Sequence, residues 1–329
     1  MVSIDSSETT RETSNTVGLN VGNTKDKDWF QQWFVGVVDG SVDEVDAGSF
    51  TYSKSGEKWT IFFKIGQSTY NLQLLHHIKT NLGVGSVLVD TDNDMASFRI
   101  RRVTHVVEYL LPIFDKYPLL TSKYFNYSIF KKAVLIMNDS TLTTAQKDEL
   151  LTNLKKVTMP TDYLSPAWAP VNFKVSSLID AMTVMSKPWL VGFTEATGSF
   201  YLVLKGPSRL VHSFAITQKL DIIVLTAIGF ILGIEVQVKN TYNSINTSNS
   251  RYIQFIVNYF FKTIKGMKSV EYRIWARSYT KGVLGHKGFD YLYAIREQMR
   301  TLRSRRLDKN FKISHFKTPR NYNTESYDN

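Results

Sequence analysis

The chain of 329 residues carries 40 Lys and Arg against 29 Asp and Glu, and its net charge of +11 favours a polyanionic partner such as a nucleic acid. The absence of cysteine excludes disulfides, zinc–cysteine sites and thiol catalysis. No apolar run reaches the roughly 18 residues of a membrane-spanning helix, so we expect no membrane partner.

The order of the chain predicts two similar halves between less regular ends. The first 27 residues are rich in Ser, Thr and Asn, which is typical of a flexible arm. The predicted divisions are an arm over 1–27, a first half over 28–137, a connector over 138–187, a second half over 188–288, and a basic helix and tail over 289–329.

In the first half, alternating and helical apolar spacing predicts a helix–strand–strand series that occurs twice. Trp59, Ile61 and Phe63 alternate as in a half-buried strand, and Gly83 ends a helix. The expected helices cover 28–40, 71–81, 105–116 and 122–137, and the expected strands cover 49–53, 58–66, 86–90 and 96–102.

The connector contains one predicted helix over 143–156, with Thr143 as its N-cap. The second half repeats the order of the first, and a helix rich in Arg follows it from Phe289. Its expected strands cover 199–205, 209–217, 235–241 and 251–259, with a polar loop over 243–250 and helices over 221–232 and 270–279.

A short apolar stretch opens each half, Phe-Val-Gly-Val-Val-Asp-Gly in the first and Leu-Val-Gly-Phe-Thr-Glu-Ala in the second. Each stretch has small residues four positions apart, Gly36 with Gly40 and Gly192 with Ala196. At helical spacing these residues share one face, and small side chains let two backbones approach closely. The pattern predicts two helices packed against each other.

These stretches, each leading to Gly-Ser-Phe, resemble the signature of the double-motif LAGLIDADG family of homing endonucleases and RNA maturases. Residues 111–123 and 163–168 also resemble members encoded in mitochondrial introns, which extends the resemblance over most of residues 30–310. It implies an α+β fold of two pseudo-twofold halves, in which a central helix pair and two curved antiparallel sheets form a nucleic-acid-binding saddle. The protein would be a monomer with an internal pseudo-dimer.

In active members of the family, an acid just before the last glycine of the motif binds the divalent metal that supports phosphodiester cleavage. Here that position is Thr197 in the second motif and Ala47 in the first, where the motif is lengthened by an insertion. Neither side chain suits a hard cation. The resemblance therefore implies degenerate catalytic positions, with Asp39 and Glu195 as relic acids and with no metal site and no cofactor.

The insertion contains Asp43, Glu44 and Asp46, which we interpret as a solvated acidic loop. The resulting hypothesis is a catalytically inactive RNA-binding protein of the mitochondrial matrix. The first choice is a structural component of the mitochondrial ribosome that stabilises rRNA beside neighbouring ribosomal proteins. The second is a splicing maturase for a group I intron. The alternative is an active, magnesium-dependent, site-specific DNA homing endonuclease that uses Asp39, Glu195 or an acid of the insertion.

The predicted nucleic-acid interface combines strand residues on the exposed sheet faces with residues near three late helices. Lys123 and Lys268 occupy equivalent places before two of these helices, as phosphate contacts or as relics of a basic residue that assists cleavage. The full predicted set is Tyr52, Lys58, Lys64, Arg99, Arg101, Lys123, Lys205, Lys239, Arg251, Lys268, Arg300, Arg303, Arg305 and Arg306.

Overall fold

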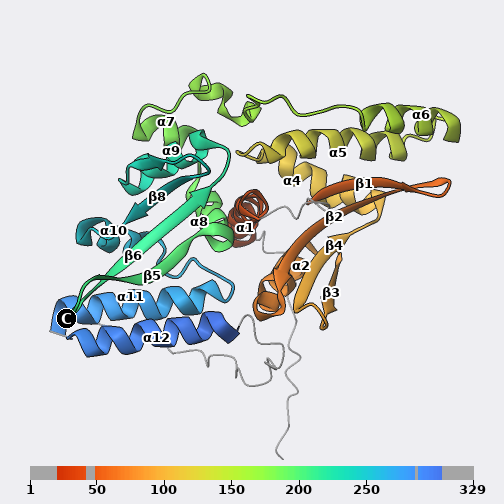
Figure 1. Cartoon of the computed structure of the whole chain (residues 1–329). Helices are drawn as coiled ribbons and strands as arrows, with labels where there is room; N and C mark the ends of the chain where they lie inside the picture. Colours follow the sequence, from red (N-terminus) through yellow and green to blue (C-terminus); the bar gives the residue numbers. More distant parts are fainter. Residues whose placement is uncertain (1–20, 42–48, 286–287, 306–329) are drawn as a thin grey trace, which may run out of the picture.

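The computed structural model describes residues 21–41, 49–285 and 288–305. Two helices cross the centre of the molecule, and one antiparallel sheet lies on each side of them (Figure 1). The first half contains α1 (Val21–Gly40), β1 (Phe50–Ser55), β2 (Lys58–Ser68), α2 (Leu72–Leu82), β3 (Ser86–Asp90), β4 (Met95–Ile100), α3 (Val103–His105), η2 (Val106–Leu110), α4 (Leu111–Lys116) and α5 (Lys123–Asn138). Residues 21–27 of the predicted arm belong to α1, and the rest of the arm lies outside the described residues.

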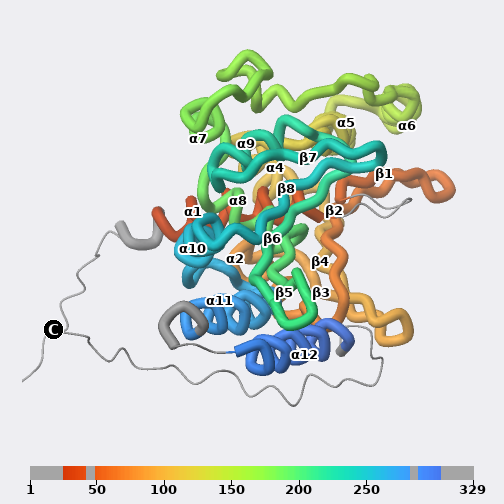
Figure 2. Tube along the Cα trace, turned by 60° about the vertical axis from the view of Figure 1, so that its left-hand side comes forward, coloured from red at the N-terminus to blue at the C-terminus, as the bar shows by residue number. Residues whose placement is uncertain are grey.

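The second half repeats this order and adds a last helix. It contains α8 (Lys187–Thr197), β5 (Ser199–Gly206), β6 (Arg209–Gln218), α9 (Ile222–Leu232), β7 (Val236–Val238), β8 (Asn243–Thr247), α10 (Ser250–Tyr259), α11 (Lys268–Gly285) and α12 (Phe289–Arg305). Between the halves lie α6 (Thr144–Leu154), the 3-10 turn η3 (Pro166–Val171) and α7 (Leu178–Val184), which run along one side of both (Figure 2).

The predicted pairing of the two motif helices is confirmed. A Cβ atom on Gly36 would lie 2.0 Å from the carbonyl oxygen of Trp189, and one on Gly192 would lie 1.9 Å from that of Trp33. Both glycines are therefore required, because only a residue without a side chain lets the α1 and α8 backbones approach this closely.

The two sheets have the same topology, β1-β2-β4-β3 and β5-β6-β8-β7, as expected for two related halves. Each sheet buries one face, through side chains such as Phe63 and Phe98 in the first and Phe200 and Phe214 in the second. We call this the core face. Because side chains alternate along a strand, the residues between these form an opposite, open face in each half.

One predicted strand, 251–259, is instead helix α10, and the predicted polar loop contains strand β8. Asn249 caps the helix, since its Oδ1 accepts a hydrogen bond from the backbone N–H of Arg251 at 2.9 Å. Ile253, Ile256 and Val257 are buried at spacings of three and four, the period of a helix rather than of a strand.

In the connector, the predicted helix is present as α6, whereas α7 was not predicted. Thr143 caps α6 in a reciprocal capping box with Gln146. Trp168 is fully buried and donates its indole N–H to the carbonyl oxygen of Leu120 at 2.8 Å, so it anchors the connector to the first half. Among the described residues, no helix is both long and apolar enough to cross a membrane.

His212 lies buried in the core of the second half, with its Nε2 atom 2.7 Å from the hydroxyl of Ser278. Burial lowers the pKa of His212 from 6.5 to about 4. Between these values the unfolded chain binds a proton that the folded chain does not. The free energy of unfolding should therefore fall as the pH decreases from 6.5 to 4, by about 3 kcal/mol from this residue.

Substitution of this histidine tests the pH dependence directly. We expect His212→Gln to be less stable than the wild type at pH 7 and to lose most of the acid-dependent decrease between pH 6.5 and 4. Urea unfolding at several pH values measures both. An unchanged slope against pH in the variant would show that His212 titrates normally in the folded protein.

Candidate nucleic-acid interface

The acid of the first motif is a buried structural group. Asp39 is 2% exposed and accepts hydrogen bonds from the backbone N–H groups of Leu120 (2.7 Å) and Thr121 (3.2 Å), the hydroxyl of Thr121 (2.5 Å) and the indole N–H of Trp189 (2.9 Å). Burial raises the pKa of Asp39 to about 6, against the lowering effect of these hydrogen bonds. Because of this shift, the contribution of Asp39 to the free energy of unfolding decreases as the pH rises from about 4 to 6. The contribution of His212 increases over the same range, so variants of each residue separate the two effects.

The acid of the second motif has the same role. Glu195 is 2% exposed, and its carboxylate accepts hydrogen bonds from the backbone N–H groups of Lys265 and Gly266, both at 2.8 Å. Burial raises its pKa as well. Each motif acid thus holds the loop that precedes the late helix of its own half. Their oxygens point into the protein, so their assignment as relic catalytic acids, and their use as catalytic acids in the alternative, do not fit the geometry.

The helices that follow these loops begin with Lys123 in α5 and Lys268 in α11, and both ammonium groups reach the carboxyl end of a motif helix. Lys123 donates to the carbonyl oxygen of Val38 at 3.0 Å, to the hydroxyl of Ser41 at 3.1 Å and to the carbonyl of Ser41. Lys268 donates to the carbonyl of Gly198. A cation is favourable at this end of a helix because of the exposed carbonyls and the helix dipole.

The register of the two helices changes which first-motif residue is equivalent to Thr197. Since Gly36 matches Gly192 across the helix pair, Ser41 occupies the position of Thr197. The insertion therefore follows the helix end and does not lengthen the helix. The sequence prediction had assigned this position to Ala47, because Ala47 directly precedes the last glycine of the motif. Ala47 and the three acids of the insertion lie outside the described residues.

Apart from Asp39 and Glu195, whose carboxylates point inward, we find no carboxylate at either helix end within the described ranges. Thr197 donates its hydroxyl to the carbonyl of Phe193 at 2.8 Å, and the other available donors are the Ser41 hydroxyl and backbone carbonyls. No cluster of three His, Asp or Glu side chains occurs in residues 21–41, 49–285 and 288–305 either. The described helix ends therefore do not by themselves fit a divalent metal ion, which prefers carboxylate oxygens.

Two contacts that the sequence reasoning missed tie each half to the helix-end loop of the other. Asn71, before α2, accepts the backbone N–H of Met267 at 2.9 Å. Asp221, before α9, accepts the backbone N–H and the hydroxyl of Ser122 at 2.7 and 3.0 Å. The sequence did contain a signal for these contacts, because Asn71 and Asp221 occupy equivalent positions before the helix that follows the second strand of each half.

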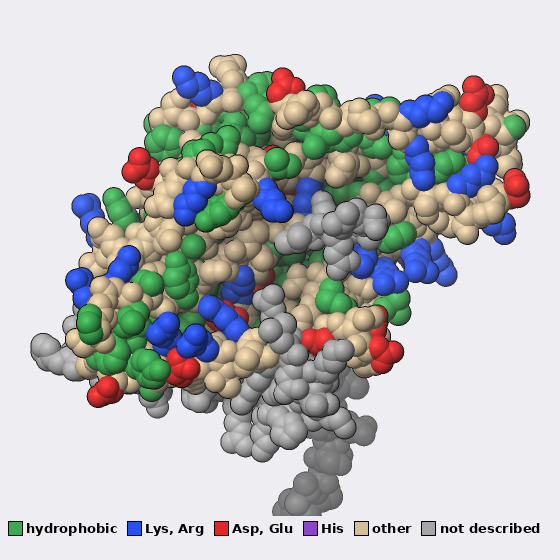
Figure 3. Space-filling view, in the orientation of Figure 1, with side chains coloured by type: hydrophobic (Ala, Val, Ile, Leu, Met, Phe, Trp, Pro, Cys, Tyr) green, Lys and Arg blue, Asp and Glu red, His purple; other side chains and the backbone are tan. Residues whose placement is uncertain are grey.

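On the first sheet, three predicted residues lie on the open face. Lys64 on β2 is paired in register with Arg99 on β4, next to the core pair Phe63 and Ile100 on the opposite face. Lys58 is exposed nearer the tip of β2, and Arg101 is exposed directly after β4. On the face seen in Figure 3, Lys and Arg side chains gather over both halves of the molecule.

Four predicted contacts are placed elsewhere by the structure. Tyr52 is on the core-face side, where its ring stacks on Trp59 with centroids 6.0 Å apart. Arg251 belongs to α10, in the helical layer over the core face of the second sheet. Arg300 pairs with Glu297 at 3.0 Å. The side chains of Arg305 and Arg306 lie outside the described residues.

The fourth displaced residue, Arg303, is part of the fold. It donates to the carboxylate of Glu271 at 3.0 Å and to the carbonyl of Phe200 at 2.5 Å. Met299 and Leu302 beside it are buried, so α12 packs on the second half, next to α11 (Figures 1 and 2). The basic composition of this helix was therefore a poor guide to its role, because part of its charge is used inside the protein.

The open face of the second sheet is polar rather than basic. Lys205 and Lys239 are exposed near strand ends, and Arg209, which the prediction omitted, is exposed at the start of β6. Tyr201 donates its hydroxyl to the side-chain oxygen of Asn246 at 3.3 Å. The exposed uncharged hydrogen-bonding side chains of this face are Ser199, Thr217, Gln237 and Asn246, whereas Ser213 and Ser244 on the same face are buried.

Two sheets on one shared helix pair, with a lysine at each helix end, define a protein of two pseudo-twofold halves. The profile of the LAGLIDADG endonuclease family matches residues 44–134 and 190–279. A Schizosaccharomyces pombe protein named probable intron-encoded endonuclease Cox1-I1b is 35% identical over 290 residues, which are 84% of this chain and 70% of that protein. The chain belongs to the LAGLIDADG endonuclease family.

More distant relatives are longer than this chain. Probable intron-encoded endonuclease 4 of Neurospora crassa is 26% identical over 260 residues, 76% of this chain and 40% of the relative. The uncharacterized mitochondrial protein RF1 of Saccharomyces cerevisiae is 28% identical over 200 residues, 60% of this chain and 37% of the relative.

Solved structures confirm the predicted double-motif fold. The I-SmaMI LAGLIDADG homing endonuclease bound to cleaved DNA has a TM-score of 0.67 at 24% identity, covering 83% of this chain and 97% of that one. The LAGLIDADG meganuclease I-AabMI bound to uncleaved DNA has a TM-score of 0.63 at 20% identity, covering 81% and 98%.

These findings overturn the predicted function. An inactive, rRNA-binding ribosomal protein is wrong, because the Schizosaccharomyces pombe and Neurospora crassa relatives are named intron-encoded endonucleases and these structural neighbours are bound to DNA rather than to RNA or ribosomal proteins. The error had two causes. The missing acids were taken as proof of inactivity, and a basic surface was assigned to RNA although phosphate attraction does not distinguish RNA from DNA.

Proposed function

We propose that this chain is a site-specific DNA endonuclease of the homing type, acting in the mitochondrial matrix. The observation that carries the proposal is the pseudo-twofold repetition of an open sheet face and a lysine-bearing helix end. The two strands of a DNA duplex are themselves related by twofold axes, so each half can meet one strand in an equivalent way. The names of the relatives, which are intron-encoded endonucleases and a mitochondrial protein, support both the activity and the compartment.

The two sheets would divide the work of recognition. The basic open face of the first sheet, with Lys64 and Arg99, suits phosphates, which position a protein on DNA without reading its sequence. The amides and hydroxyls on the open face of the second sheet suit the donor and acceptor groups of base edges.

The two helix ends differ in the acids that follow them. Three acids, Asp43, Glu44 and Asp46, follow the first end in the sequence, whereas Gly198 and Ser199 follow the second. We therefore expect cleavage of one strand only. Magnesium is the proposed cofactor, with carboxylates outside the described residues as ligands; when bound, such an ion activates water and stabilises the leaving oxygen.

DNA binding is tested by removing open-face charge. Lys64→Ala and Arg99→Ala should each weaken binding to a duplex target selected from a randomised library, by about tenfold, and reduce the dependence of log affinity on log salt by about one unit. Fluorescence anisotropy over a salt series measures both effects.

The matched control is Lys54→Ala, which removes a cation from the core-face side of the same sheet, where Lys54 pairs with Asp148 at 2.6 Å. It should leave DNA affinity unchanged. If Lys54→Ala weakens binding as much as Lys64→Ala, or if duplex RNA of the same sequence binds as tightly as DNA, the proposed interface is wrong.

A further inference from the structure

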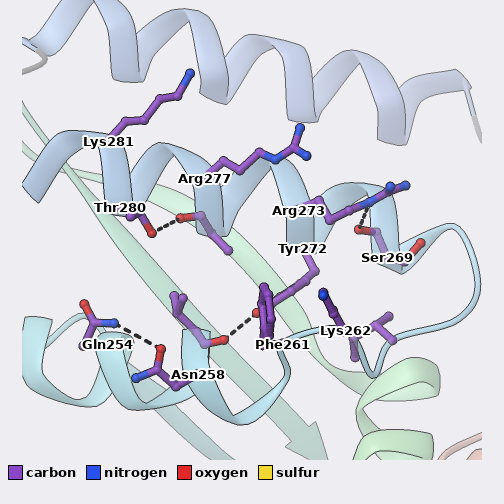
Figure 4. Close-up of a pocket in the computed structure, with 13 residues that line it drawn as sticks. Gln254, Asn258, Phe261, Lys262, Ser269, Tyr272, Arg273, Arg277, Thr280 and Lys281 are labelled. Carbon is purple, nitrogen blue, oxygen red and sulfur yellow. Dashed lines mark hydrogen bonds between the residues drawn. The ribbon is translucent and has the colours of Figure 1, made fainter. Parts of the chain in front are cut away.

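A second basic surface lies on the opposite side of the second sheet, in the helical layer over its core face. A groove with a volume of about 920 Å³ runs between α10 and α11 (Figure 4). Its floor is formed by the apolar side chains of Val257, Ile264, Tyr272 and Ala276, each 4–9% exposed. Phe261 at its margin is 61% exposed, and the Lys262 ammonium lies 5.2 Å from the centroid of its ring.

Cations surround this apolar floor. Arg273, Arg277 and Lys281 follow one another at four-residue intervals along α11, and Lys262 lies across the groove from them (Figure 4). No acid is among the residues that line the groove. Arg273 donates only to the carbonyl of Ser269 in its own helix, and in the described part of the chain no carboxylate pairs with any of the four cations.

The first half shows what the fold itself requires at this place. Tyr127 on α5 and Tyr272 on α11 are equivalent, since the hydroxyl of each lies within hydrogen-bond distance of a carbonyl of the preceding helix, Leu111 or Val257. In the first half Asp115 accepts Tyr127 at 2.7 Å and pairs with Lys131 at 2.7 Å.

The second half keeps the tyrosine but has no acid at this place. It presents the exposed Phe261 and a row of cations instead. Because an ion-paired arrangement satisfies the same fold in the first half, the basic groove is not needed for folding.

The chemistry of the groove defines its occupant. An apolar floor with a basic rim complements a helix that has apolar residues on one face and acidic residues beside them. The cations on α11 span two helical turns, which matches acids spaced four residues apart on a facing helix. A nucleic-acid strand would satisfy the rim but would leave the concave apolar floor without a partner.

We propose that the groove between α10 and α11 is a docking site for an acidic amphipathic helix of a partner protein. The partner would bind on the helical side of the second half while the open sheet faces remain available for DNA. The site therefore adds a protein-recruiting surface to the proposed endonuclease and does not depend on DNA cleavage.

A defined peptide tests the proposal on the full chain. The probe is a fluorescent helical peptide of about 15 residues with Leu along one face and Glu at four-residue spacing beside it. We expect saturable binding by anisotropy, with an affinity about tenfold or more lower for Arg273→Glu/Arg277→Glu and for Phe261→Ser. A scrambled peptide of the same composition should bind weakly.

The control variant is Lys132→Glu on α5, an exposed residue at the position in the first half that matches Arg277. It should bind the peptide like the wild type. The proposal is overturned if the peptide fails to bind, if the scrambled peptide binds equally, or if the groove variants retain full affinity. Peptide binding only after removal of residues 1–20 would also overturn it, because the occupant would then be the chain's own amino-terminal segment. The proposal is also overturned if the groove variants lose affinity for single-stranded DNA but not for the peptide.

Discussion

Gly192→Val is expected to prevent this chain from folding into its native structure. Even the first side-chain atom at this position would lie 1.9 Å from the carbonyl oxygen of Trp33 and 2.9 Å from the backbone nitrogen of Val37. Both neighbours belong to the backbone of α1, so relief requires the two motif helices to separate. Because this helix pair joins the cores of both halves, we expect a loss above about 4 kcal/mol, at the extreme of single substitutions.

Circular dichroism and thermal unfolding of the purified variant measure this effect. Gly66→Ala is the matched control, since a Cβ atom there would meet only the ends of the Met95 and Lys64 side chains, at 3.8 and 3.9 Å. It should leave the melting temperature within a few degrees of the wild type. Gly36→Val should behave like Gly192→Val, because the two glycines face each other's helices. A cooperative wild-type melting curve for either valine variant would show that the helix pair is not required.

Thr197→Asp is expected to convert the proposed single-strand cleavage into double-strand cleavage. The substitution places a carboxylate at the end of α8, beside the Lys268 ammonium at Gly198. A carboxylate is a far better ligand for a hard divalent cation than the threonine hydroxyl, which here donates to the carbonyl of Phe193. The gain should exceed about a hundredfold in the rate at which the second strand is cut.

A supercoiled plasmid that carries the selected target, incubated with magnesium, distinguishes the products. The wild type should yield the nicked circle, Thr197→Asp the linear form, and the control Thr197→Ser the nicked circle again. If the wild type already linearises the plasmid, the two helix ends are equally active and the proposed asymmetry is wrong. If Thr197→Asp binds the target normally and still only nicks it, the end of α8 is not a cleavage site.

The sequence alone was sufficient for features that depend on local spacing. Small residues four positions apart predicted the helix pair, alternation predicted the first hairpin of each sheet, and Thr143 predicted the start of α6. These predictions succeeded because periodicity determines which residues share a face, whatever the rest of the chain does.

Only the tertiary structure decided what each face meets. Asp39 and Glu195 are carboxylates within the motifs and could have been catalytic acids, yet both accept hydrogen bonds from backbone N–H groups distant in the sequence. Arg303 had the charge of a phosphate ligand, yet it pairs with Glu271. A charged residue has the same local signal whether its partner is solvent, nucleic acid or a buried group of its own chain, so its role depends on long-range contacts that spacing does not encode.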